Sequence, residues 1–165
     1  GTNDYVTVAD HADLDFADGV FSVSAWVNFA SLPGTWNPIV QKFDGTGYQL
    51  GAKSTNRLYL QCGSEDQCAY SDTVTIPLGT WIHVAATYNG NTTTTGKIYL
   101  NGVDVTAVAE VATVAANSQP FIIGTDTTNY TDSMIADVRV YNTVLALADI
   151  QKLASKMNVR YRLTV

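Results

Sequence analysis

The segment TWIHVAATYNG, residues 80–90, places a tryptophan, a histidine and a tyrosine close together. His83 could act there as a general base beside an aromatic platform for a substrate. Neither His83 nor His11, however, accompanies a nucleophile motif such as Gly-x-Ser-x-Gly. His83 alternates with Trp81 along a strand-like stretch, which favours a framework histidine that is hydrogen-bonded inside a sandwich of sheets.

Carboxylates are the second group that could do chemistry. Glycoside hydrolysis needs two of them, about 5 to 10 Å apart across the scissile bond. The chain has only two glutamates, Glu65 and Glu110, and each stands without a carboxylate partner on its own segment. Asp13 and Asp15 are close in sequence, but they lie in a loop-like stretch. The sequence therefore predicts a protein that is not an enzyme.

Aromatic residues in polar loops suggest carbohydrate binding, because rings stack on sugars while carboxylates and amides bind the hydroxyls. Trp36 lies in SLPGTWNP, a segment bounded by Pro and Gly, where it either caps the edge of a sandwich or forms an exposed platform. The segment GTDTTNYTDS is the densest polar and aromatic group in the chain. A structural role stays open for each residue of the predicted glycan site, which comprises Trp36, Tyr70, Asp126, Asn129 and Tyr130.

The two cysteines, Cys62 and Cys68, flank a turn-like GSED sequence. They could face each other across a hairpin and form a disulfide, or remain free thiols. A zinc site would need more Cys or His ligands nearby than the sequence offers. We predict the disulfide, and with it an extracellular or surface-exposed location in an oxidising compartment.

The overall composition excludes some classes of partner and favours one class of fold. The net charge is −6 and the nine Lys and Arg residues form no basic cluster, so we expect no nucleic-acid partner. No apolar run approaches the roughly 20 residues of a membrane span, so we expect no membrane insertion. Asp supplies 13 of the 15 acids, and Thr, Val and Tyr are abundant. This balance indicates an all-β protein with loops rich in oxygen ligands.

The pattern along the chain predicts ten or eleven short strands separated by Gly, Asn and Asp turns. One helix is expected over residues 145–155, where Leu147, Ile150 and Leu153 form an apolar stripe. Residues 156–165 are either a tail or a final strand. We expect a single domain over residues 1–165, since no linker or internal repeat interrupts the chain.

Several segments in order carry a resemblance to a known family: FSVSAWVNF, IVQKFDGTGYQL, LGTWIHVAATYNG, KIYLNGVDV, FIIGT and IADVRVYN. Together they resemble the laminin-G-like jelly roll of the concanavalin A-like lectin/glucanase superfamily, over roughly Gly1 to Leu153. The resemblance implies an antiparallel β-sandwich with one short C-terminal helix.

The resemblance also implies a structural calcium ion that joins the first strand region to the closing strand. The residues here that resemble its ligands are Asn3, Asp18 and Asp137. Ala136 stands where many members carry an acid, and a solvated or turn-capping role is the alternative for each Asp. An excess of Asp over Glu is consistent with bound calcium.

Function must be inferred from the sites, because this fold carries many activities. We expect a non-catalytic module that binds a glycan or polysaccharide and belongs to a larger, multidomain secreted or surface protein. The alternative is a structural or adhesive module of a cell surface or virus particle, which binds protein or no glycan.

Overall fold

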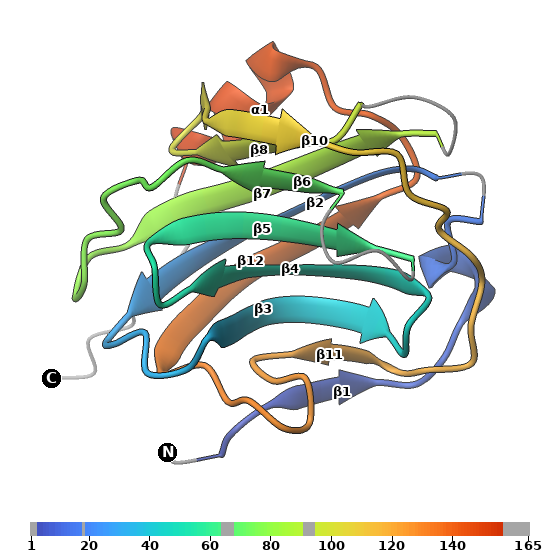
Figure 1. Cartoon of the computed structure of the whole chain (residues 1–165), viewed down its shortest axis with the longest axis horizontal. Coiled ribbons are helices and arrows are strands. Elements are labelled where there is room, and N and C mark those ends of the chain that lie inside the picture. The colour runs from blue at the N-terminus through green and yellow to red at the C-terminus, as the bar shows by residue number, and fades with distance from the viewer. Residues whose placement is uncertain (1–2, 18, 64–67, 91–94, 157–165) are drawn as a thin grey trace, which may run out of the picture.

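Strand β2 (Val20–Phe29) shows how the chain alternates between the two faces of a sheet. Val23, Val27 and Phe29 belong to the buried core, whereas Trp26 and Asn28 point to the opposite face. Strands of this kind form two packed antiparallel sheets in the computed structural model, which describes residues 3–17, 19–63, 68–90 and 95–156 (Figure 1).

The larger sheet has seven strands among the described residues, and every neighbouring pair is antiparallel. Their order across the sheet is β1 (Val6–Val8), β11 (Phe121–Ile123), β3 (Trp36–Phe43), β4 (Gly47–Lys53), β5 (Arg57–Cys62), β6 (Ala69–Ser71) and β10 (Thr106–Ala109). Strand β6 is short, because the stretch CAYSDTVTI contributes only Ala69–Ser71 to the sheet.

The second sheet has five strands among the described residues, in the order β12 (Ser133–Tyr141), β2, β7 (Ile82–Asn89), β8 (Lys97–Leu100) and β9 (Val103–Asp104). Helix α1 (Leu147–Ala154) packs on its outer face, where Ile150 contacts Ala85 and Tyr99. A short 3₁₀ turn spans Ala12–Leu14. The predicted antiparallel β-sandwich with one short C-terminal helix is thus confirmed. The question of a tail or final strand at residues 157–165 lies outside the described residues.

The core lies between the two sheets. At one end it is rich in aromatic rings, with Phe21 lying 5.3 Å from Phe16 and 5.0 Å from Tyr48, centroid to centroid. Tyr88 is fully buried there, and its hydroxyl both donates to the carbonyl and accepts from the amide of Ala112, at 2.8 Å each. The buried hydroxyl is therefore satisfied within the core.

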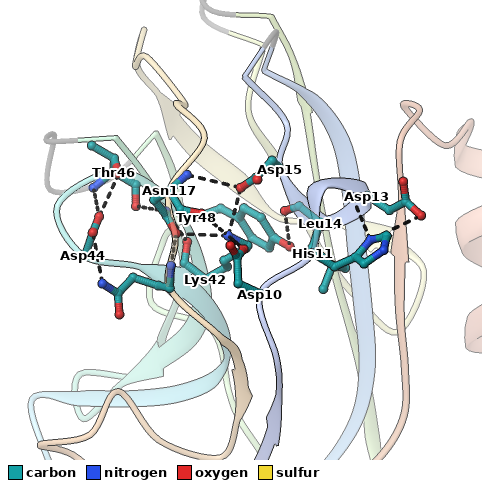
Figure 2. A network of polar contacts seen from close by, with 11 residues as sticks. Asp10, His11, Asp13, Leu14, Asp15, Lys42, Asp44, Thr46, Tyr48 and Asn117 are labelled. Carbon is teal, nitrogen blue, oxygen red and sulfur yellow. Dashed lines mark hydrogen bonds and ion pairs between the residues drawn. The ribbon is translucent and has the colours of Figure 1, made fainter.

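A buried ammonium group fastens the segment before β2 to the larger sheet (Figure 2). Lys42 on β3 is 1% exposed, and its Nζ lies 2.8 Å from Asp10 Oδ1 and 2.9 Å from Asp15 Oδ1. It also donates to the carbonyl and side-chain oxygens of Asn117, at 2.6 and 3.1 Å. Burial alone lowers the pKa of Lys42, but the two carboxylates outweigh it and raise this pKa above its ordinary value.

Cys62 at the end of β5 and Cys68 before β6 form the predicted disulfide, with their Cα atoms 5.5 Å apart. It closes the connection between two neighbouring strands of the larger sheet. Among the described residues, no helix is long and apolar enough to cross a membrane.

Candidate functional site

A row of three glutamines crosses the outer face of the larger sheet. The strand register places Gln49 on β4 directly between Gln41 on β3 and Gln61 on β5. Gln49 Nε2 donates to Gln41 Oε1 at 2.9 Å. The side-chain amide of Gln61 has no hydrogen-bond partner among the described residues. Gln41 and Gln49 are buried, whereas Gln61 is half-buried, so Gln61 offers most of the accessible amide donor and acceptor surface on this face.

Tyr59 extends the row toward the middle of the sheet. It pairs with Gly51 on β4, and its hydroxyl donates to Gln49 Oε1 at 2.9 Å. A Cβ atom on Gly51 would lie 2.5 Å from the Tyr59 hydroxyl oxygen, so only glycine lets the ring lie across β4. Burial, followed by the charge of Asp126, raises the pKa of Tyr59 well above its ordinary value. The hydroxyl is thus a neutral, fixed hydrogen-bond donor.

Trp36 lies beside this row, as the first residue of β3. The expectation that it belongs to a loop is therefore wrong, because its backbone pairs with Lys53 of β4. Its half-buried ring meets Tyr59 edge to face, with centroids 4.8 Å apart, and the Lys53 ammonium lies 4.0 Å from the ring centroid. The remaining indole surface lines a hollow on the sheet.

The β11–β12 loop, residues 124–132, forms the side wall of that hollow. Asp126 Oδ1 accepts from the backbone amides of Thr128 and Asn129, at 3.0 and 2.6 Å. Asp126 Oδ2 accepts from Asn129 Nδ2 at 2.9 Å. The carboxylate therefore holds the loop in shape, as Asp commonly does in turns, and Asn129 Oδ1 is left facing outward near Gly34.

We call this depression the sheet hollow. It has a volume of about 380 Å³, and its lining includes Trp36, Gln41, Gln49, Gln61, Asp126 and Asn129. Its described lining consists mainly of neutral amides beside aromatic rings. It contains one carboxylate, whose two oxygens are already engaged by the loop. These groups can bind a hydroxylated ring, whereas two-carboxylate hydrolysis would need a second acid.

The predicted glycan residues divide into three groups. Trp36, Asp126 and Asn129 come together in the sheet hollow although about 90 positions separate them in sequence. Tyr70 lies on the same face, opposite Tyr59, and Arg57 covers its ring at 5.5 Å. It is not part of the lining of the sheet hollow.

Tyr130 belongs to a different depression, which we call the end hollow. This hollow lies where the β11–β12 loop meets the ends of β2 and β12, and its lining includes Asn3, Asn28, Tyr130, Asp132, Ser133 and Met134. The expectation that Tyr130 shares one surface with Asp126 and Asn129 does not match this arrangement, because Asp126 and Asn129 line the sheet hollow whereas Tyr130 lines the end hollow.

The predicted calcium ligands are Asn3, Asp18 and Asp137, of which Asn3 and Asp137 belong to the described residues. Both oxygens of Asp137 accept from the Arg139 guanidinium, at 2.9 and 3.1 Å, so an ion there would have to displace it. Asn3 lines the end hollow, and Asp18 lies outside the described residues. No group of three or more His, Cys, Asp or Glu in the described parts of the chain could hold a metal ion. Calcium binding stays a prediction.

Sequence reasoning missed the three glutamines, Tyr59 and Gly51. Neutral amides within strand-like stretches carry no signal of their own. Only the register between β3, β4 and β5 places them in one row, and that register was not predicted.

The two packed antiparallel sheets with one short helix are the architecture of a concanavalin A-like β-sandwich. A family model described as the concanavalin A-like lectin/glucanases superfamily matches residues 1–151. The chain belongs to this superfamily. No curated protein sequence matches it significantly.

Solved structures with the same fold include three of different kinds. Trypanosoma rangeli sialidase is 18% identical with a TM-score of 0.62, and the match covers 84% of this chain but 23% of the sialidase. Domain 4 of AbnA, an extracellular GH43 arabinanase from Geobacillus stearothermophilus in complex with arabinotriose, is 23% identical with a TM-score of 0.63, covering 82% and 66% of the two chains.

The third is the binding domain of botulinum neurotoxin DC in complex with rat synaptotagmin II. It is 16% identical with a TM-score of 0.65, and the match covers 92% of this chain and 39% of that one. The chain thus corresponds to less than a quarter of the sialidase and about two fifths of the toxin domain. At these identities the comparisons establish the fold.

Proposed function

We propose that this domain binds a saccharide in the sheet hollow and does so without catalysis. The observation that carries the proposal is the convergence of Trp36, Asn129 and the glutamine row on one depression of the sheet. Amides both donate to and accept from hydroxyl groups, and an indole packs against the apolar face of a sugar ring. Arabinotriose bound to AbnA domain 4, a domain of the same fold, is consistent with this proposal.

The lining favours a neutral saccharide. Amides dominate it, and its single described carboxylate would repel an anionic sugar. The single described carboxylate also supports a non-catalytic role. Asp126 is held by its own loop and faces no second acid in the described lining.

The cellular setting belongs to the proposal as well. The Cys62–Cys68 disulfide supports an extracellular or surface-exposed location, since disulfides persist in oxidising compartments. The structural relatives named above carry this fold as one part of a longer chain, which supports a role within a multidomain protein. A structural calcium ion remains part of the proposal, to be tested by adding a chelator.

Calorimetric titration with neutral arabino-, xylo-, gluco- and manno-oligosaccharides tests the proposal. Trp36→Ala should weaken binding of the preferred sugar at least about tenfold, the loss expected when one ring contact disappears. Val103→Ala is the control, because Val103 is an exposed residue of β9 that lines neither the sheet hollow nor the end hollow.

Two results would reject the proposed function. One is equal weakening by Trp36→Ala and Val103→Ala, which would mean that the indole has no special role. The other is silence of the wild-type domain toward the whole panel, which would leave the structural or adhesive module as the better account.

A further inference from the structure

The end hollow has the features of a second binding site. Its volume is about 790 Å³, within the range of small-molecule sites in proteins. It lies across the β11–β12 loop from the sheet hollow: residues 126–129 of the loop face the sheet hollow, and residues 130–132 face the end hollow. Neither Lys nor Arg occurs in its described lining.

Two polar side chains at its base lack partners. Asn28 is 8% exposed, yet its side-chain amide makes no hydrogen bond to another described residue. Ser133 Oγ is buried and likewise has no partner. Buried polar groups in folded proteins are satisfied in the large majority of cases, and an unsatisfied one destabilises the fold. Both residues line the hollow. A ligand there can bond the Asn28 amide directly, and it can bond Ser133 Oγ once that hydroxyl rotates toward the hollow.

The position of Asn28 explains why the protein itself does not satisfy the amide. Asn28 is the next-to-last residue of β2 and pairs with Met134 of β12, so its side chain points away from the core residues Val27 and Phe29. The neighbouring Met134 is 55% exposed and offers no hydrogen bond of matching strength. The amide therefore opens toward the hollow rather than toward a protein partner.

An aromatic wall completes the hollow. Tyr130 is 37% exposed, and its ring lies 6.3 Å from that of Tyr5, tilted by 54°. Asp132 adds a carboxylate, of which Oδ2 accepts from Ser31 Oγ at 2.6 Å. The hollow thus combines a ring face, an amide, a hydroxyl and a carboxylate. These groups match a ligand that has an apolar face and several hydroxyl groups.

From these contacts we propose that the end hollow is a second saccharide site, which takes a neutral sugar ring. The ring packs on Tyr130 and exchanges hydrogen bonds with Asn28, Ser133 and Asp132. Asp4 and Asp132 in the lining exclude anionic sugars by charge repulsion. The β11–β12 loop separates the two sites, and its internal hydrogen bonds, such as Thr131 N to Gly124 O at 2.9 Å, hold it as a fixed partition. This proposal stands on its own geometry and does not require that the sheet hollow bind a sugar.

Nitrogen-15 NMR of the side-chain amides tests the second site directly. The same neutral oligosaccharide panel is titrated to about 20 mM, which covers dissociation constants in the millimolar range. Asn28 reports on the end hollow, and Gln41 and Gln61 report on the sheet hollow. We expect at least one sugar to shift the Asn28 amide resonances in the wild-type domain and, undiminished, in Trp36→Ala.

Tyr130→Ala should raise the dissociation constant measured at Asn28 about tenfold, the effect of losing one ring contact, while the glutamine signals keep their response. Val103→Ala, at an exposed position on β9, is the neutral control. The second site is overturned if no sugar shifts the Asn28 amide. It is equally overturned if Trp36→Ala abolishes that shift, which would make it a remote effect of the sheet hollow. Failure of the sheet hollow alone leaves the Asn28 response intact, so the two proposals fail separately.

Discussion

His83 is buried on the outer face of the five-stranded sheet, where its ring meets Trp26 at 5.5 Å. The prediction of a framework histidine pointed to a hydrogen-bonded ring inside the sandwich. In the structure, the hydrogen bond is made by its backbone amide, which donates to Asn101 Oδ1 at 2.8 Å. The ring Nδ1 is buried without a hydrogen-bond partner among the described residues. Burial lowers the pKa of His83 to about 4; Asp137 opposes this shift by raising the pKa, and Arg139 lowers the pKa further.

This shift predicts a stability that falls in mild acid. The folded pKa lies below the ordinary value of 6.5, so between these two values the unfolded chain binds the proton and the folded chain does not. The contribution is therefore complete above about pH 6.5 and is lost as the pH falls toward 4. Linkage gives a loss of about 2 kcal/mol between pH 7.5 and 5.

Urea unfolding at both pH values should show that His83→Gln loses less stability than the wild type over this interval. The change in the free energy of unfolding between the two pH values is compared in the two proteins. This comparison removes the contribution of the carboxylates, which both proteins share. Identical pH dependence in the two proteins would mean that His83 titrates normally in the folded state.

At the scale of elements, Lys42 joins three segments that are distant in sequence: the stretch before β2, strand β3 and the stretch before β11. The abundance of Asp indicated oxygen sites for a cation. At this place Asp10 and Asp15 surround an ammonium group instead. A lysine within the strand-like PIVQKF gave no signal of burial, because its partners come from loops that the sequence does not bring together.

Replacement of the ammonium should therefore destabilise the fold. Lys42→Met leaves Asp10 and Asp15 without their counter-charge and should lower the free energy of unfolding by about 3 kcal/mol, as expected when one partner of a buried ion pair is removed. Lys97→Met is the control, since the exposed Lys97–Asp104 pair should contribute less than about 1 kcal/mol. Equal effects of the two substitutions in urea unfolding would contradict a special role for Lys42.

The sequence predicts where strands lie along the chain better than it predicts which strands pair with one another. The segment FSVSAWVNF falls within β2, and the predicted helix at residues 145–155 lies within a few residues of α1, because alternation and a helical stripe are local signals. Trp36 and the pair Asp126 and Asn129 were recognised by residue type. Their meeting with Gln41, Gln49 and Gln61 depends on the order β11-β3-β4-β5, which no local pattern specifies.

At the scale of the whole molecule, the β11–β12 loop sets the arrangement of the two proposed sites. It connects β11 of the larger sheet to β12 of the smaller one (Figure 1). Its first half lines the sheet hollow, and its residues 130–132 line the end hollow. Two sites on one module would let it hold two sugar units of one polysaccharide, or two chains, with an avidity above that of either site.

The measurement that tests the central claim most directly is an NMR titration of the domain with neutral oligosaccharides, read at the Trp36 indole and the side-chain amides of Gln41, Gln49 and Gln61. The account predicts that one sugar shifts all four together, with a single dissociation constant that rises at least about tenfold in Gln49→Ala, which breaks the row. Shifts confined to other surfaces, with these four signals unmoved by every sugar, would contradict saccharide binding in the sheet hollow.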